Sequence, residues 1–100
     1  MQSIRGRILC TEDDVDTREL IDLVLTRSGY DVVCSANNVQ AVELARTQTF
    51  DLDLVDNWMP GFSGTQLTEK LRQFDLKTPT FKFSMKGSLI LITANLDRQN

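Results

Sequence analysis

The stretch DLDLVDNWMPGFSG, residues 51–64, contains the feature on which the fold prediction rests. Its apolar residues predict a core strand over residues 50–56, and this strand ends on Asp56. Pro60 and Gly61, two turn-forming residues, follow almost at once. A carboxylate at the tip of a core strand, next to a stiffened turn, indicates a functional group at the rim of a sheet.

Strands and helices alternate along the chain. Strands are predicted at residues 7–11, 30–35, 50–56 and 80–84, with helices between them. The helices are expected to begin at side chains that cap helices, namely Asp14 or Asp16, Asn37 or Asn38, and Ser63. Leu20 and Val39 are among the positions expected on the buried faces of the first two helices. This alternation with short connections predicts a parallel α/β sheet.

The composition fits one domain over residues 1–100, with 41% apolar and 25% charged residues. The net charge is −3 and there is no basic run, so a nucleic-acid partner is not expected. No apolar run is long enough to cross a membrane or to act as an export signal, so we expect a cytoplasmic protein. Cys10 and Cys34 are interpreted as buried, reduced residues. The lack of histidine excludes a Ser-His-Asp triad and a histidine phosphodonor in this chain.

Three acidic residues are expected to meet at the carboxyl edge of the sheet. Glu12 and Asp13 follow the first strand, and Asp56 ends the third. These two strands are neighbours if the chain reverses its winding after the second strand. Carboxylates gathered in one place repel one another unless a cation lies among them, and oxygen ligands suit Mg²⁺ or Mn²⁺. Ser84 can present its hydroxyl to the same edge, so Asp56 is a reasonable phosphoryl acceptor.

Two charged residues fit the predicted strands badly. Asp53 lies in the middle of the third strand, and Lys82 lies between two phenylalanines in the fourth. A buried and unpaired charge is costly. Lys82 is easiest to accommodate near a sheet edge, and a cross-strand pair between Asp53 and Lys82 is a second option.

Residues 85–93 predict a change of direction in the chain. LILIT (89–93) is a further strand candidate, and only MKGS (85–88) separates it from the fourth strand. Four residues cannot hold a crossover helix, whereas they suit a hairpin that contains Gly87. We therefore expect an antiparallel final strand.

The motifs ILCTEDDVDTREL, LVDNWMPGFSG and TPTFKFS together resemble the receiver domain of two-component response regulators. The resemblance covers residues 7–84 in order. It includes an acidic pair after the first strand, an Asp followed by x-x-Met-Pro-Gly, and a hydroxyl five residues after a proline. It implies a flavodoxin-like, doubly wound α/β sheet of order 2-1-3-4-5. In this chain we expect three helices, with a C-terminal hairpin replacing the usual helix four, strand five and helix five.

The resemblance also implies a role for each matching residue. Asp56 matches the aspartate that a partner histidine kinase or phosphotransfer protein phosphorylates. The implied ligands of Mg²⁺ (or Mn²⁺) are Glu12, Asp13, Asp56 and the main-chain carbonyl of Trp58. Ser84 matches the hydroxyl that hydrogen-bonds the phosphoryl group, while Asn57 and Trp58 occupy positions that tune how long this group persists.

Beyond residue 84 the sequence departs from the family pattern, so residues 85–100 are expected to form a divergent segment. No Lys-Pro pair closes a fifth strand, and the lysine that binds the phosphoryl group in the family has no match. Lys86 lies in a different element and does not take this role. LILITAN can also be aligned as a fourth strand that ends in Thr93, although TPTFKFS, with Pro79, is the better match.

The leading functional hypothesis is a phosphoacceptor receiver domain, which is a signalling module rather than an enzyme. The alternative is a truncated receiver-like domain that no longer switches and acts only as a protein-interaction module. A homodimer is a separate expectation, because a second copy could cover an exposed sheet face. A phosphatase that uses the DLD pair at 51–53 is disfavoured, because the pair lies at the start of its strand.

Overall fold

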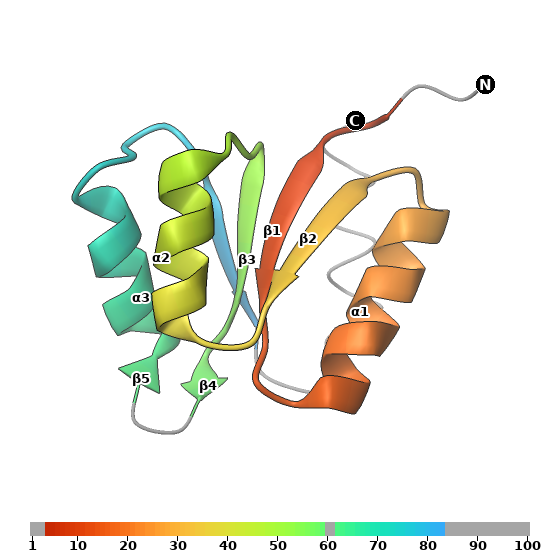
Figure 1. The fold of residues 1–100 in the computed structure, drawn as a ribbon, viewed down its shortest axis with the longest axis horizontal. Coiled ribbons are helices and arrows are strands. Elements are labelled where there is room, and N and C mark those ends of the chain that lie inside the picture. Colours follow the sequence, from red (N-terminus) through yellow and green to blue (C-terminus); the bar gives the residue numbers. More distant parts are fainter. Residues whose placement is uncertain (1–3, 60–61, 84–100) are drawn as a thin grey trace.

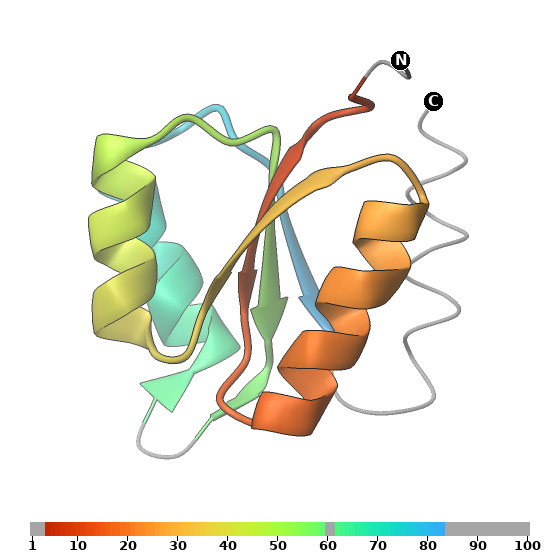
Figure 2. The same cartoon turned by 45° about the vertical axis from the view of Figure 1, so that its right-hand side comes forward.

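A four-stranded parallel sheet forms the centre of the molecule in the computed structural model, which describes residues 4–59 and 62–83 (Figure 1). Its strands are, in spatial order, β2 (Asp31–Ser35), β1 (Arg7–Thr11), β3 (Leu52–Asp56) and β6 (Thr80–Phe83). Helix α1 (Val15–Arg27) covers one face of the sheet, and α2 (Asn38–Thr47) and α3 (Gly64–Arg72) cover the other (Figure 2). None of the described helices is long and apolar enough to cross a membrane.

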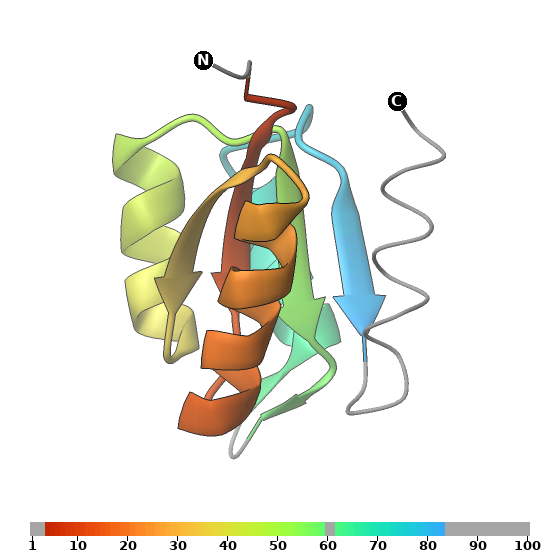
Figure 3. The same ribbon diagram turned by 90° about the vertical axis from the view of Figure 1, so that its right-hand side faces the viewer.

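The strand order confirms the predicted reversal of winding after the second strand. β1 pairs with β2 on one side and with β3 on the other, so the ends of β1 and β3 are neighbours. β6 lies beside β3 on the side away from β1 (Figure 3). Within the described residues, the predicted strand order is therefore confirmed as 2-1-3-4, with three helices. The predicted fifth strand and the hairpin over residues 85–93 lie outside the described residues.

The helix starts follow from local hydrogen bonds. Asp14 caps α1 and accepts a hydrogen bond from the backbone nitrogen of Thr17 at 2.9 Å. Asn37 caps α2 in the same way. Ser63 caps α3 and forms a reciprocal capping box with Gln66. In each case a side chain satisfies a backbone N–H that has no partner inside its helix.

Each face of the sheet has its own hydrophobic core. The cluster beneath α1 consists of Ile8, Cys10, Ile21, Leu25, Tyr30, Leu52, Leu54 and Phe83. The cluster beneath α2 and α3 consists of Leu9, Ala41, Phe50, Val55, Leu67 and Leu71. The alternation of strand residues between the two clusters shows that both faces of the sheet are covered, as expected for parallel strands.

Two helix positions differ from the prediction. Leu20 is 50% exposed and Val39 is 75% exposed, although both were expected on buried faces. α1 buries only a narrow stripe through Ile21 and Leu25, which are four residues apart, and Leu20 lies about 100° away around the helix. In α2 the buried residue is Ala41.

The two charged strand residues do not form the suggested pair. Asp53 lies opposite Thr80, whereas Lys82 lies opposite Val55. Lys82 is exposed on β6, and its Nζ contacts the Thr65 hydroxyl at 3.5 Å. Lys82 is therefore accommodated by exposure to solvent. Asp53 is buried, and within residues 4–59 and 62–83 its Oδ2 has no hydrogen-bonding partner.

A short hairpin follows β3, and it was not predicted. β4 (Trp58–Met59) pairs with β5 (Phe62–Ser63) in antiparallel orientation (Figure 1). Pro60 and Gly61, the predicted turn residues, lie outside the described residues. The hairpin leads the chain directly from the end of β3 to the start of α3.

Candidate functional site at the carboxyl edge of the sheet

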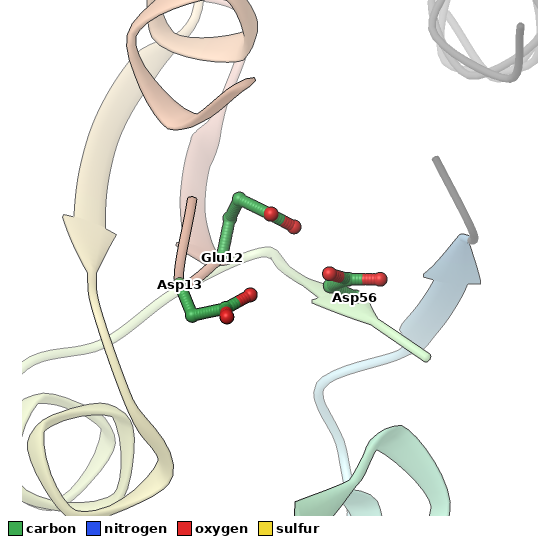
Figure 4. Close-up of side chains that lie close together, drawn as sticks. All are labelled: Glu12, Asp13 and Asp56. Atoms are coloured by element: carbon green, nitrogen blue, oxygen red, sulfur yellow. The ribbon is translucent and has the colours of Figure 1, made fainter. Parts of the chain in front are cut away.

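Three carboxylates meet where β1 and β3 end. Glu12 and Asp13 directly follow β1, and Asp56 is the last residue of β3 (Figure 4). One ligand oxygen of each residue can be chosen so that all three lie within 4.8 Å of one another. The parallel order of the sheet produces this cluster, because it brings together residues that are far apart in sequence.

Glu12 is held in place through its main chain. Its backbone nitrogen donates a 3.0 Å hydrogen bond to the Ser35 carbonyl, and its own carbonyl accepts a 3.0 Å bond from Arg18 Nη1. Its side chain is 2% exposed. Oε1 accepts a 3.2 Å bond from the Asp14 nitrogen, while Oε2 is buried and has no hydrogen-bonding partner among the described residues. The contact from Arg18 could not be predicted, because nothing in the sequence marks a side chain six residues away as its partner.

The three consecutive acidic residues have separate positions. Glu12 is buried at the edge of the sheet, whereas Asp13 is exposed beside it. Asp14 turns away to cap α1, and its Oδ2 accepts hydrogen bonds from both the nitrogen and the hydroxyl of Thr17. The structure thus selects Asp14 between the two caps that the sequence allowed, Asp14 and Asp16.

The electrostatics of the cluster disfavour a second negative charge. Burial of Glu12 and, after it, the Asp56 carboxyl group beside it raise the pKa of Glu12 from 4.5 to about 8. Asp56 itself is 1% exposed. Two carboxyl groups this close to each other share a proton unless a cation takes its place.

The residues present fit a hard divalent cation. In the part of the chain that the structure describes, the cluster offers only oxygen ligands, and the buried Glu12 Oε2 is an acceptor without a partner. Mg²⁺ and Mn²⁺ prefer carboxylate and carbonyl oxygens and keep several waters in their coordination shell. The exposed position of Asp13 leaves one side of the cluster open to solvent.

The segment after Asp56 is fixed by its neighbours. The Asn57 nitrogen donates a 2.6 Å hydrogen bond to the Phe83 carbonyl at the end of β6. The Gly64 nitrogen, at the start of α3, lies 3.4 Å from the Asn57 carbonyl. Gly64 is the first residue of α3, where its bare α-carbon lets the helix approach the chain after Asp56.

The resemblance also assigned roles to Asn57, Trp58 and Ser84, and the structure describes these three residues only in part. The main chain of Trp58 begins β4, directly after the site. Asn57 is half-buried beside Asp56. Ser84 lies outside the described residues. The roles assigned to these three residues therefore stay predictions.

Comparison with known families decides the assignment. Residues 8–99 match the model of the response regulator receiver domain. The chain belongs to the response regulator receiver family. The matched range includes residues 85–99, the segment for which the motifs alone predicted divergence. The receiver domain resemblance seen in the sequence is thus confirmed.

Known relatives of this receiver domain are longer proteins. The uncharacterized transcriptional regulatory protein YkoG of Bacillus subtilis is 29% identical over 85% of this chain and 37% of its own length. The response regulator protein PilR of Pseudomonas aeruginosa is 34% identical over 85% of this chain and 19% of its own length. The receiver domain therefore spans well under half of these relatives.

Solved structures confirm the fold of this receiver domain. The response regulator protein TrrA from Thermotoga maritima, in complex with Mg²⁺-BeF, superposes with a TM-score of 0.71. The match covers 90% of this chain and 97% of TrrA, at 21% sequence identity. The flavodoxin-like topology predicted from the sequence is therefore the topology of known receiver domains.

Proposed function

We propose that this receiver domain, a single unit over residues 1–100, accepts a phosphoryl group on Asp56 from a histidine kinase or a phosphotransfer protein. The observation that carries the proposal is the convergence of Glu12, Asp13 and Asp56 on one point at the carboxyl edge of the sheet. A buried acceptor without a partner, Glu12 Oε2, supports a cation at the same point.

The proposed step is an in-line displacement. A carboxylate oxygen of Asp56 attacks the phosphorus of a phosphohistidine, the phosphorus–nitrogen bond breaks, and the imidazole leaves with its electron pair. The product is an acyl phosphate on Asp56. Glu12 and Asp13, with the Trp58 main-chain carbonyl, would hold Mg²⁺ (or Mn²⁺), and the bound ion would neutralise charge on the phosphoryl oxygens. TrrA, a structural neighbour, is described in complex with Mg²⁺-BeF, which supports this assignment.

The surroundings of Asp56 suit this role. Asp56 ends a strand that is buried along its whole length, so its carboxylate is held in one place. The Asn57 nitrogen is anchored to β6, which makes the loop after Asp56 part of the sheet edge. We assign Asn57 and Trp58 to tuning the lifetime of the phosphoryl group, and Ser84 to a hydrogen bond with it.

Trp58 fluorescence provides the test, because Trp58 is the single tryptophan and lies two residues from Asp56 in sequence. Mg²⁺ is titrated first, and beryllofluoride or a small acyl phosphate is then added. We expect a saturable response to each addition. Asp56→Asn should abolish the response to beryllofluoride, and the mass of the protein should then show no phosphoryl adduct with the acyl phosphate.

Asp16→Asn is the matched control. Asp16 is also an aspartate close to the edge, but it is exposed in the first turn of α1. It should respond like the unmodified protein. If Mg²⁺ and beryllofluoride change nothing in a sample whose circular dichroism shows a folded protein, Asp56 is not a phosphoacceptor. The domain would then act only through protein contacts.

A further inference from the structure

The two cysteines of the chain lie side by side in the sheet. Cys10 of β1 is the register partner of Cys34 of β2. Both side chains are on the α1 face, since Cys10 belongs to the cluster beneath α1 and Cys34 packs against it. Both are free thiols. Register and face together place the two sulfur atoms next to each other, although the residues are far apart in sequence.

The geometry of this pair is compatible with a disulfide. Adjacent strands are about 4.8 Å apart, so register partners have a similar Cα separation. Disulfides span Cα separations of roughly 4.4–6.8 Å. The strands are parallel and the register is direct, so both Cβ atoms leave the sheet in the same direction. A bond would join two strands that are already hydrogen-bonded. It would also draw together two Cβ atoms that start about 4.8 Å apart, because disulfides join Cβ atoms about 3.5–4.5 Å apart.

The two thiols differ in their surroundings, which gives each a separate role. Cys10 is fully buried, whereas Cys34 is half-buried. The hydrogen bond with Cys10 lowers the pKa of the Cys34 thiol, and the Arg18 guanidinium lowers it too, against burial and the Asp22 carboxylate. Cys34 therefore has a lowered thiol pKa and, of the two cysteines, the better access to solvent.

We propose that Cys10 and Cys34 form a redox-reactive pair, which a peroxide oxidises to a disulfide across β1 and β2. Nothing in the phosphoacceptor assignment requires this pair, and the proposal stands independently of it. The pair lies near the carboxyl edge of the sheet, because only Thr11, the last residue of β1, separates Cys10 from Glu12. The chemical class of the ligand is a small, uncharged two-electron oxidant such as hydrogen peroxide.

The chemistry takes place in two steps. The Cys34 thiolate attacks one oxygen of hydrogen peroxide, the oxygen–oxygen bond breaks, and hydroxide leaves as a sulfenic acid forms. The Cys10 sulfur then attacks the Cys34 sulfur and expels the sulfenic oxygen as water, with the Cys10 proton. In total, two thiols lose two electrons and two protons, and one peroxide becomes two waters.

The test uses the folded, reduced protein and hydrogen peroxide. Intact mass should fall by two hydrogen atoms, neither residue should react with a thiol reagent once the oxidised product is denatured, and the product should remain a monomer. Peptide mapping should show residues 10 and 34 linked, and dithiothreitol should restore both thiols. Cys10→Ser should instead gain oxygen on Cys34, because no second thiol can resolve the sulfenic acid. Cys34→Ser should leave Cys10 unmodified.

Several results would overturn the proposal. One is a folded protein that keeps both thiols reduced under peroxide while the same chain in denaturant forms the disulfide. Another is a product that contains only intermolecular dimers, or only oxygen adducts of Cys34 in the unmodified protein. Should Cys10→Ser fail to fold because Cys10 is fully buried, Cys34→Ser and the peptide map still decide the outcome.

Discussion

Gly64 and Asn57 are packed so closely that no side chain fits at Gly64. A β-carbon built there would lie 2.9 Å from the Asn57 Cα and 3.1 Å from the Asp56 carbonyl oxygen, and both neighbours are backbone atoms that cannot rotate away. The start of α3 therefore rests directly on the two residues that form one wall of the site. This contact joins the third helix to the proposed phosphoacceptor.

Gly64→Ala should consequently move α3 away from Asp56 and destabilise the fold. Overpacking of this kind costs about 1–3 kcal/mol, which urea denaturation followed by circular dichroism measures directly. Gly6→Ala is the matched control, because a β-carbon at Gly6 would be 3.4 Å from the Asp51 carboxylate, an ordinary contact with a side chain. An equal loss of stability in the two variants would show that the close backbone contact at Gly64 is not the cause of the loss.

The helices and strands could be predicted because their signals are local. Asp14, Asn37 and Ser63 cap their helices through backbone N–H groups three residues away at most, so the sequence contains both partners of each bond. The exposure of Leu20 and Val39 depends on where a helix rests on the sheet, which local periodicity does not determine. The β4–β5 hairpin has two residues in each strand, too few to show an alternating pattern.

The carboxylate cluster could be predicted as well, for a different reason. A parallel sheet brings the ends of its strands to one edge, so Glu12, Asp13 and Asp56 needed only the strand order to meet. The close approach of Gly64 and the hydrogen bond from Arg18 depend on how helices pack around that edge. Such contacts join residues whose distance is set by the whole fold, and no spacing in the sequence marks them.

Glu12→Gln should remove the stabilisation that Mg²⁺ gives to the folded protein. The substitution keeps the shape of the side chain but takes away the charge whose buried oxygen lacks a partner. In the unmodified protein, Mg²⁺ at ten times its dissociation constant should add about 1.4 kcal/mol of stability by mass action. A thermal melt with and without Mg²⁺ measures this difference.

The control for Glu12→Gln is Glu19→Gln, which changes the same chemical group at an exposed position of α1. It should keep the full effect of Mg²⁺. A Glu12→Gln protein that is stabilised by Mg²⁺ as much as the unmodified protein would place the cation elsewhere.

Asp13 and Asp14 are adjacent, yet substitution of each by alanine should affect a different property of the protein. Asp14→Ala removes the cap of α1 and should cost about 1 kcal/mol of stability, with the response to Mg²⁺ retained. Asp13→Ala should leave stability nearly unchanged, because Asp13 is exposed, and should weaken the Mg²⁺ response. Urea denaturation and the Trp58 fluorescence titration separate the two effects. If both variants lost the same property, the division of roles among the acidic residues would be wrong.

Asp53→Asn should change how stability depends on pH. Burial and the Asp75 charge raise the pKa of Asp53 from 3.8 to about 6, against a lowering effect of Arg72. The unfolded chain loses this proton near pH 3.8, so the folded protein binds one proton more between that pH and about 6. The stability that this proton gives is fully present below pH 3.8, the pKa of Asp53 in the unfolded chain. It is lost as the pH rises through about 6, the pKa of Asp53 in the folded protein.

The size of this effect can be measured as a difference between two proteins. From about pH 5 to about pH 7.5, the unmodified protein should lose roughly 1–2 kcal/mol more stability than Asp53→Asn, whose amide does not titrate. Other titrating groups are common to both proteins and cancel in the comparison. Parallel pH profiles would mean that Asp53 titrates alike in the folded and unfolded chain. In solution, Asp53 would then not be buried between its sheet neighbours Leu9 and Thr80 as it is in the structure.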